Sequence, residues 1–541
     1  MSPAAPASRA RSGGSGGRPR SRAVAEHDRL IPTPWQLSLV LGAAGGAGML
    51  LAFPPYDLWF LLPLAIAALT AAAMTRRALA AIAGSLAWGL AFFVPLTAWA
   101  NTYAGTMPWI ALGVFQALFP VLFALLARTV LVRRGLGIGS GIVIAALWVG
   151  VETLRSHTPW GGLPWGATAF ALSQSPLLNL GPWIGTAGLS FLCALLALLV
   201  LRGVLALASR SRTGLGGIGG LAPIAVSVTV VAACLVVPHP ANPAPEGRPS
   251  IRVAGIQGNM EPIDPVAFTM PEGVFENHLA VSQEVLAEEG QGLDLMVWPE
   301  DSTSVDPRED LWRGEQLTRL AQEADAPIMV GTQTPTQDGR RYNYSLLWSP
   351  DGGVAYQYAK RHPVPFGEYI PARDLFRLVT DKVDLVSSDM IAGDEVGIAE
   401  VGPTRAGVLI CFEIAYESLV QDVVDDGAEL IVVQSNNALF GDSDEAIQQL
   451  AEARVLAVVS GRSVVHVSTV GHSAIYSPEG RQLAYAGHWE QGSVVADVPL
   501  RTGLTPAVRA GWWIPLGISA LGAAGLLAAL SRGRRAIARR P

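Results

Sequence analysis

Cysteine is scarce in this chain of 541 residues, which has only three, Cys193, Cys234 and Cys411. Cys193 and Cys234 lie within long hydrophobic stretches, which leaves Cys411 without an evident disulfide partner. Cys411 ends an apolar run and stands two residues before Glu413. A lone thiol at the end of a strand beside charged residues is a candidate nucleophile, and the alternative is a small buried hydrophobic residue.

Lysine is scarcer still, since only Lys360 and Lys382 are lysines among the 38 basic residues and all the others are arginines. Lysine can lose its proton when burial lowers its pKa, whereas arginine cannot. Lys360 follows a strand-like stretch and is adjacent to Arg361. The choice of lysine at this position suggests chemistry that requires an amine, and chance placement is the alternative.

Several familiar ligand-binding patterns are missing. The chain has no glycine-rich phosphate loop and no cluster of histidines and cysteines, and its eight histidines are scattered. No pattern supports nucleic-acid binding. We therefore expect no metal, no cofactor and no nucleic-acid partner.

Charged residues make up only 15% of the chain and hydrophobic residues 50%, a composition that favours a membrane protein. A helix that crosses a bilayer needs about 20 mostly apolar residues. Eight segments meet this requirement approximately, at 35–54, 58–75, 78–100, 109–132, 137–154, 183–201, 220–238 and 511–530.

Arginines are concentrated in every second connection between these segments. Loops rich in basic residues stay in the cytoplasm, so we assign these connections to the cytoplasmic side. Arg155 is the exception. The first apolar run lacks a clear cleavage site, so we interpret it as a retained span. The pattern predicts a disordered cytoplasmic tail at 1–30, transmembrane helices 1–7 within 31–238, an extracytoplasmic domain at 239–510, transmembrane helix 8 at 511–530 and a cytoplasmic tail at 531–541.

The connection 156–183 contains Trp160, Trp165 and Trp183 among glycines and prolines. Tryptophans at such places usually mark the membrane interface, and we prefer this interpretation to a direct ligand contact. Glu152 lies near the end of the fifth apolar segment. An ionisable group at membrane depth suggests function, and a water-exposed position near the surface is the alternative.

Residues 251–500 contain 39 acidic and 15 basic residues. Strand-like and helix-like stretches alternate along this region, which favours a layered α/β domain. Helix-like stretches occupy 273–289, 312–324, 415–425 and 444–460. Strands are expected at Ile251–Gln257, Leu293–Trp298, Ile328–Thr332, Tyr344–Trp348, Val354–Tyr358, Ala406–Cys411, Glu429–Gln434, Ser463–Thr469 and Ser493–Asp497.

Three chemically useful side chains follow three of these strands, namely Glu300, Lys360 and Cys411. Because α/β sheets gather chemistry at strand ends, we expect the three to meet. Glu300 would act as a general base, Cys411 would attack a carbonyl and form a thioester, and Lys360 with the backbone N–H of Phe412 would stabilise the oxyanion.

The motifs around these residues carry a resemblance to a known family. They are Trp298-Pro299-Glu300, the run from Lys360 to Tyr369 (KRHPVPFGEY) and Cys411-Phe412-Glu413. Together they resemble the Glu–Lys–Cys set of the carbon–nitrogen hydrolase (nitrilase) superfamily. The second motif and the surrounding spans are similar to those of the apolipoprotein N-acyltransferase family, over residues 35 to 530.

The resemblance implies a polytopic bundle of eight transmembrane helices that carries an extracytoplasmic, nitrilase-like α–β–β–α sandwich in the bacterial cytoplasmic membrane. It implies transfer of a fatty acyl chain from a membrane phospholipid, through a Cys411 thioester, to the N-terminal amine of a diacylated apolipoprotein. Glu368 and Glu413 would support the site, with Glu368 orienting Lys360. We expect the chain to act as a monomer.

The resemblance has one departure beside the nucleophile, because Phe412 stands where many family members have tyrosine. Candidate substrate-binding residues are Phe366, Tyr369, Asn436, Asn437 and Phe440. The loops 366–370 and 436–442 would form a lid that keeps water away, and ordinary surface turns are the alternative. Glu445, Gln448 and Arg454 share one helix face, and we interpret them as structural.

Two other functions remain open from the residues alone. A membrane-anchored amidase could use the same three side chains on a small amide, although one span would suffice to anchor it. A transporter or scaffold with a degenerate domain is the non-enzymatic alternative. The intact set of Glu300, Lys360 and Cys411 argues against it, and we find no inverted repeat among the spans.

Overall fold

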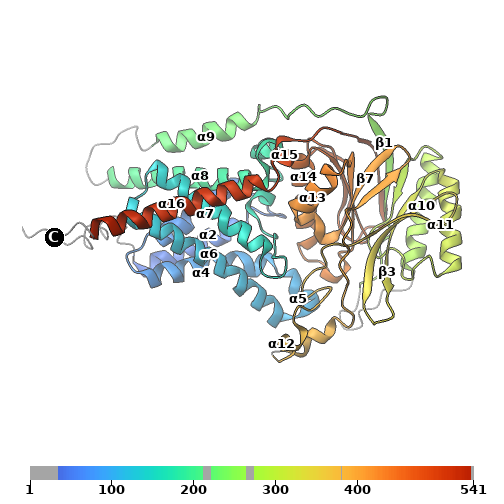
Figure 1. Cartoon of the computed structure of the whole chain (residues 1–541), viewed down its shortest axis with the longest axis horizontal. Helices are drawn as coiled ribbons and strands as arrows, with labels where there is room; N and C mark the ends of the chain where they lie inside the picture. Colours follow the sequence, from blue (N-terminus) through green and yellow to red (C-terminus); the bar gives the residue numbers. More distant parts are fainter. Residues whose placement is uncertain (1–33, 211–220, 263–272, 379, 538–541) are drawn as a thin grey trace, which may run out of the picture.

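A computed structural model describes residues 34–210, 221–262, 273–378 and 380–537. The chain forms two parts that lie end to end, a helical bundle and a β-sandwich domain (Figure 1). The predicted disordered tail at 1–30 lies outside the described residues. Within the predicted tail at 531–541, residues 531–537 continue the last helix.

The bundle consists of apolar helices whose sequences contain few charged residues. Among the described residues, five helices are long and apolar enough to cross a membrane by length and composition, and three more apolar helices are shorter. One apolar helix overlaps each of the eight predicted segments. The bounds are α2 Trp35–Leu50, α3 Leu62–Ala73 after the 3₁₀ turn η1 Trp59–Leu61, α4 Ala78–Leu96, α6 Thr106–Arg134, α7 Ile138–His157, α8 Gly181–Arg210, α9 Ala222–Cys234 and α16 Trp513–Ile537.

The third predicted segment, 78–100, differs from the observed structure because it is not one helix. The helix α4 ends at Leu96, and a separate short helix, α5, follows at Trp99–Ala104. Pro95 lies in the last turn of α4 and cannot donate a backbone hydrogen bond to continue it. The helix α5 therefore projects from the bundle toward the sandwich (Figure 1).

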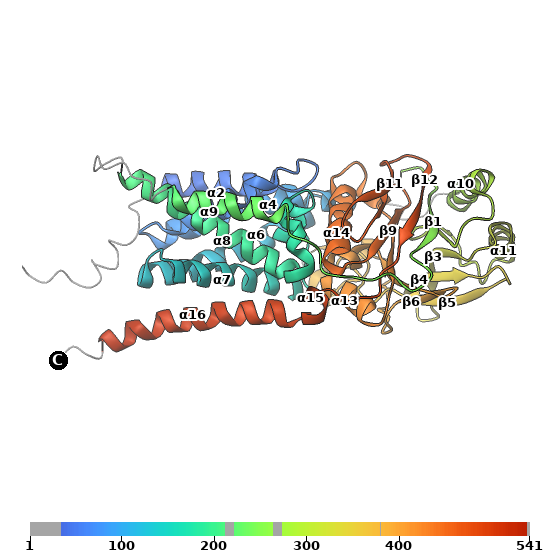
Figure 2. The same cartoon turned by 90° about the horizontal axis from the view of Figure 1, so that it is seen from above.

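Close packing in the bundle depends on small residues. A Cβ atom added to Gly42 of α2 would lie 1.9 Å from the carbonyl oxygen of Gly84 in α4, so only glycine permits this approach. The indole Nε1 of Trp88 donates to the carbonyl oxygen of Ala65 at 3.0 Å. The last helix, α16, lies along the side of the bundle (Figure 2).

Arginines near the C-terminal end of α6 contact the end of α3, the connection after it and the last helix. Arg128, near the end of α6, donates to the carbonyl oxygens of Ala73 at 3.3 Å and of Arg76 at 2.9 Å, just after α3. Arg133 donates to the carbonyl oxygen of Leu530 in α16 at 3.5 Å. These contacts bring together connections that the sequence pattern assigned to one side of the membrane.

Glu152, in α7, is partly buried and held by protein contacts. Its Oε1 accepts hydrogen bonds from the backbone N–H and the hydroxyl of Thr168, at 2.7 and 2.8 Å. Thr168 begins the 3₁₀ turn η2, Thr168–Leu172, which precedes another such turn, η3, Pro176–Leu180. Glu152 thus anchors the connection between α7 and α8.

The sandwich contains two six-stranded sheets with mixed parallel and antiparallel pairing. One has the order β12-β1-β2-β3-β4-β5, and the other has the order β11-β10-β9-β8-β7-β6. The bounds are β1 Ser250–Gln257, β2 Leu295–Val297, β3 Ile328–Pro335, β4 Arg341–Trp348, β5 Val354–Ala359, β6 Ile398–Val401, β7 Thr404–Ile410, β8 Leu430–Ser435, β9 Ser463–Ser468, β10 Ser473–Tyr476, β11 Gln482–Ala486 and β12 Gly492–Pro499.

Nine of these strands fall where the sequence predicts them, and β6, β10 and β11 are additional. The two sheets face each other across an apolar core that includes Val253 and Val297 of one sheet and Val408 and Val432 of the other. Alternate residues of a strand face opposite sides, so the central strands are buried on both faces.

Helices cover both outer faces of the two sheets (Figure 1). On the side far from the bundle lie α10 Val274–Glu289 and α11 Leu311–Ala324, and between the sheets and the bundle lie α13 Glu417–Asp425 and α14 Glu445–Ser460. The remaining elements are α12 Arg373–Arg377, η5 Asp381–Leu385, η6 Cys411–Ala415, η7 Ala438–Phe440 and α15 Pro506–Ala510. The domain is thus a layered α–β–β–α sandwich, as the resemblance implies.

A substitution at Gly331 in β3 tests how closely this strand packs against the segment that follows β2 and carries Glu300. A Cβ atom there would lie 2.5 Å from the carbonyl oxygen of Pro299 and 2.6 Å from the Cα of Glu300. We expect Gly331→Ala to lower the melting temperature by several degrees, since overpacking costs about 1–3 kcal/mol. Gly492→Ala, where nothing lies within 4 Å of an added Cβ, is the matched control. Equal thermal unfolding curves for the two variants would refute this reading of the packing.

Candidate active site

The three side chains predicted to meet follow strands of both sheets. Glu300 comes three residues after β2, and Lys360 directly follows β5 in the same sheet. Cys411 directly follows β7 of the other sheet. The candidate site therefore bridges the two halves of the sandwich.

Lys360 is 1% exposed and lies between two carboxylates. Its Nζ donates to Oε1 of Glu368 at 2.6 Å and to Oε1 of Glu300 at 3.2 Å. Burial acts to lower the pKa of Lys360, but the negative charges of Glu300 and Glu368 outweigh it and hold this pKa well above its ordinary value. Lys360 is thus a charged ammonium in the resting site.

Glu300 is also buried, and both of its oxygens accept hydrogen bonds. Oε1 accepts from Nδ2 of Asn343 at 2.7 Å as well as from Lys360, and Oε2 accepts from the backbone N–H of Asn436 at 2.9 Å. Burial raises the pKa of Glu300 to about 7, with Lys360 opposing the shift. A carboxyl group with this pKa can take up and release a proton near neutral pH.

Cys411 is the first residue of η6, directly after β7, and its backbone is strained. Its φ is +53°, in the left-handed region that residues other than glycine rarely adopt. Burial raises the pKa of its thiol well above the ordinary value, and the charge of Glu300 adds to this while that of Lys360 opposes it. The resting group is therefore a thiol, and its nucleophilic form requires a base and a nearby cation.

Glu413 connects the turn after β5 to the turn after β7. Its Oε1 accepts from the backbone N–H groups of Arg361 at 2.7 Å and His362 at 3.0 Å, and its Oε2 accepts from that of Ile410 at 2.8 Å. The hydroxyl of Tyr358 lies 3.0 Å from both oxygens. Glu413 is fully buried, so these bonds replace the water that it loses on folding.

Glu368 contacts Lys360 as the resemblance implies. Its second oxygen, Oε2, accepts from the backbone N–H of Val364 at 2.6 Å, which closes the turn that carries it. This bond holds the Glu368 carboxylate in place, and the carboxylate in turn positions the ammonium of Lys360.

The two predicted lid loops both contact aromatic residues of the bundle. In the loop 366–370, the ring of Phe366 lies 5.6 Å from the ring of Trp160. The backbone N–H of Phe366 donates to the carbonyl oxygen of Tyr369. In the loop 436–442, the ring of Phe440 lies 5.5 Å from that of Trp99 and 5.7 Å from that of Tyr103. Both loops thus lie at the junction of the two parts of the molecule.

Asn436 and Asn437 lie beside Glu300, but their side chains make protein contacts. Nδ2 of Asn436 donates to Asp301 at 3.0 Å, and Nδ2 of Asn437 donates to Oε2 of Glu445 at 2.6 Å. Asn437 is only 1% exposed. In this structure both residues brace the wall of the site.

Phe412 faces the bundle and stacks on Trp165, with ring centroids 5.9 Å apart and planes inclined by 17°. Trp165 is fully buried, and its Nε1 donates to Oε1 of Gln448 in α14 at 2.7 Å. The interpretation of Trp165 as a membrane-interface residue is therefore wrong. It docks the turn that carries Cys411 onto the bundle.

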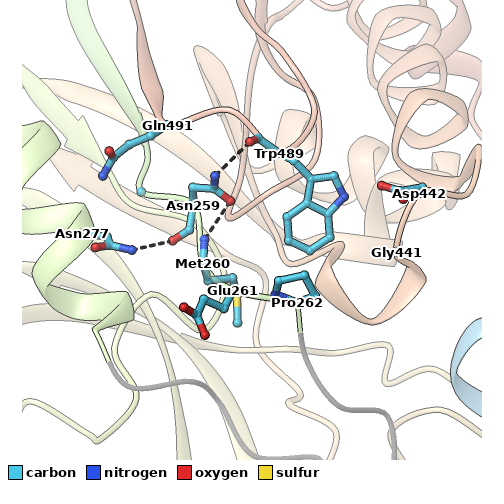
Figure 3. A pocket seen from close by; sticks show the side chains of 10 residues that line it. Asn259, Met260, Glu261, Pro262, Asn277, Gly441, Asp442, Trp489 and Gln491 are labelled. Carbon is cyan, nitrogen blue, oxygen red and sulfur yellow. Dashed lines mark hydrogen bonds between the residues drawn. The ribbon is translucent and has the colours of Figure 1, made fainter.

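A cavity of about 640 Å³ opens beside this site, between the segment after β1 and the loop 436–442 (Figure 3). Its walls include Met260, Asp442 and the ring of Trp489. The backbone N–H of Asn259 donates to the carbonyl oxygen of Thr469. The hydroxyl of Thr469 in turn donates to the backbone carbonyl oxygen of Glu300 at 3.0 Å. One wall of the cavity is thereby attached to the backbone of the candidate base.

Sequence reasoning missed Asn343 and Tyr358, which contact Glu300 and Glu413, and Gln449, whose Nε2 lies 3.5 Å from the sulfur of Cys411. These residues sit inside regular strands or a helix, where no local motif marks them. Among the residues that the structure describes, no group of three or more His, Cys, Asp or Glu side chains is arranged to hold a metal ion.

Comparisons with known proteins match both parts of the chain. Residues 45–199 match the family described as the apolipoprotein N-acyltransferase N-terminal domain, and residues 252–504 match the carbon–nitrogen hydrolase family.

Similar proteins cover nearly the whole chain. The apolipoprotein N-acyltransferase of Mycolicibacterium smegmatis is 31% identical, over 98% of this chain and 91% of that protein. The protein of the same name from Geobacter metallireducens is 29% identical, over 79% and 80%. A solved amidase from Nesterenkonia sp. covers 49% of this chain and 95% of its own, with 17% identity and a TM-score of 0.36, too low to support an inference.

Removing the lysine tests the electrostatics of the site. Because the charge of Lys360 lowers the pKa of the Cys411 thiol, we expect Lys360→Met to raise that pKa and to slow alkylation by iodoacetamide at neutral pH by about tenfold or more. Modification of Cys411 is followed by mass spectrometry across a pH series. Lys382→Met, at the exposed second lysine, is the control. Equal alkylation rates in the two variants would show that Lys360 does not act on the sulfur.

Proposed function

The chain belongs to the apolipoprotein N-acyltransferase family, and on this premise we propose that it transfers a fatty acyl chain from a membrane phospholipid to the N-terminal amine of the diacylglyceryl-cysteine of bacterial apolipoproteins. The observation that supports this most strongly is the buried contact of Lys360 with Glu300 and Glu368, within electrostatic reach of the Cys411 thiol. The apolar bundle beside the site supports lipid substrates.

In the first half-reaction, Glu300 takes the proton of the Cys411 thiol and the thiolate attacks the ester carbonyl of the phospholipid. The ammonium of Lys360 stabilises the negative charge that develops on the carbonyl oxygen. When the tetrahedral intermediate collapses, the carbon–oxygen bond of the ester breaks. The departing alkoxide receives the proton from Glu300 and leaves as a lysophospholipid, and the acyl group remains on sulfur as a thioester.

In the second half-reaction, the uncharged N-terminal amine of the acceptor attacks the thioester carbonyl. Glu300 takes a proton from the attacking nitrogen, and Lys360 again stabilises the oxyanion. The carbon–sulfur bond then breaks, so that an amide forms and the thiolate is regenerated. The proton held by Glu300 returns to sulfur, which restores the starting state.

Water has to be excluded while the thioester waits for the second substrate, because hydrolysis would waste it. The burial of Glu300, Lys360 and Cys411 serves this requirement. The loops 366–370 and 436–442 act as the lid, and Phe366, Tyr369 and Phe440 contact the acyl chains. The aromatic contacts of Phe366 and Phe440 with Trp160, Trp99 and Tyr103 couple this lid to the bundle.

Membrane orientation follows from the arginine-rich connections of the bundle. We assign these connections to the cytoplasm, with both chain termini there, and we assign residues 239–510 to the outer side of the bacterial cytoplasmic membrane. The helices within 31–238 and 511–530 would then cross the bilayer. Since one copy carries all the groups that the mechanism uses, the protein acts as a monomer.

A thioester trap tests the proposed function. Purified protein given phospholipid with a labelled acyl chain should acquire a label that hydroxylamine removes, and added diacylated peptide should receive it. We expect Cys411→Ser to lower transfer by about a thousandfold or more, because an alcohol is much harder to deprotonate than a thiol. Lys360→Arg should also fail, since the larger planar group cannot occupy the same place between two carboxylates.

The contrary outcome is release of labelled free fatty acid with no transfer to peptide. It would identify a hydrolase. The Lys382→Arg variant, changed at an exposed position, should transfer at the unmodified rate.

A further inference from the structure

A buried chain of polar side chains leads away from the sulfur of Cys411. It consists of Gln449 and Glu445 in α14 and Asn437 at the start of η7, which are 0%, 3% and 1% exposed. None of the three belongs to the Glu–Lys–Cys set. Buried amides must pair each donor with an acceptor, so the hydrogen bonds fix which way each group points.

The orientation of Asn437 follows from its neighbours. The hydroxyl of Ser468 donates to Oδ1 of Asn437, and its oxygen accepts from the backbone N–H of Gly471 at 2.9 Å. Nδ2 of Asn437 therefore points the other way. It donates one hydrogen to Oε2 of Glu445 at 2.6 Å and the other to Oε1 of Gln449 at 3.0 Å.

The orientation of Gln449 follows in turn. Its Oε1 faces the Asn437 amide, so its Nε2 faces Sγ of Cys411, at 3.5 Å. Turning the amide over would set two NH₂ groups against each other. A side-chain NH₂ can only donate, so the sulfur must be the acceptor, and a negatively charged sulfur accepts a hydrogen bond far better than a neutral thiol does.

The charges around Cys411 explain why such a donor matters. Burial is the largest cause that raises the pKa of the thiol; Glu300, Glu445 and Glu368 add to the rise, and Lys360 opposes it. His466 on β9 lies 3.3 Å from Oε1 of Gln449, but burial lowers its pKa to about 4, so it brings no positive charge at neutral pH. A thiolate among these groups needs stabilisation from a neutral donor.

We propose that Gln449 is a further catalytic residue, whose amide N–H donates to the Cys411 thiolate, and that Asn437 and Glu445 are positioning residues that keep this N–H aimed at the sulfur. The inference rests on the proposed function and extends it to each state with charge on sulfur. These are the attacking thiolate of the first half-reaction and the departing thiolate of the second. The uncharged sulfur of the thioester is a weaker acceptor. The contact therefore stabilises the two thiolate states relative to the thioester.

The test measures the pH dependence of Cys411 alkylation in the full-length protein. Gln449→Met removes the donor at similar length, and Gln449→Glu replaces it with an acceptor of the same size. We expect the alkylation profile to move upward by about one pH unit or more in Gln449→Met, so that the rate at pH 7 falls about tenfold, and to move farther in Gln449→Glu. Gln421→Met, on α13, is the matched control and should leave the profile in place.

An unchanged profile in either folded Gln449 variant would overturn the proposal, because a purely structural role lowers the melting temperature without moving the titration of the sulfur. Asn437→Leu adds a check on positioning, since it removes the amide that holds Oε1 of Gln449 without changing any charge near the sulfur. A smaller upward shift is expected, and an unchanged profile would contradict the positioning role. Alkylation requires no acyl donor. Failure of the thioester trap with unmodified protein would therefore refute the proposed function separately.

Discussion

The buried carboxylate of Glu413 is the interaction on which the rest of the site depends. Glu413 lies in η6, directly after β7, and accepts backbone N–H groups from Ile410 at the end of β7 and from Arg361 in the turn after β5, a strand of the other sheet. Hydrogen bonds to a charged group contribute about 1.5–3 kcal/mol each, and leaving a carboxylate buried without them would be costly. One side chain therefore holds the lysine turn and the strained cysteine turn at a fixed separation across the sandwich.

Burial then sets the chemistry of the groups so held. Lys360 keeps its charge because two carboxylates contact it, and Glu300 reaches a pKa of about 7 because desolvation outweighs the lysine. The sulfur lies among three carboxylates and one ammonium, which makes the amide of Gln449 a consequential neighbour. The stack of Phe412 on Trp165 fastens this charged centre to the apolar bundle. A proton-transfer site is thereby held beside helices that suit lipid chains.

Much of this organisation could be predicted from the sequence. Apolar runs and alternating strands indicated a bundle with a layered α/β domain, and polar residues after three strands identified Glu300, Lys360 and Cys411. Contacts between distant segments could not be read in the same way. Trp165 resembled an interface residue until α14 was seen to cover it, and Gln449 and Asn343 lie in regular elements with no local signal. The short strands β6, β10 and β11 carry too few alternating residues to stand out. The pKa of Lys360 shifts upward, not downward, because its direction depends on which carboxylates fold around the ammonium.

The most direct test of the central claim is the rate at which Cys411 of a Glu413→Gln variant becomes acylated by labelled phospholipid. A glutamine in this place keeps one acceptor oxygen but turns an NH₂ toward a backbone N–H that Glu413 now accepts, so the two turns should separate. We expect acylation to fall about a hundredfold or more in protein that still unfolds cooperatively. Acylation at the unmodified rate in such folded protein would show that Glu413 does not hold the site together, and would contradict this account.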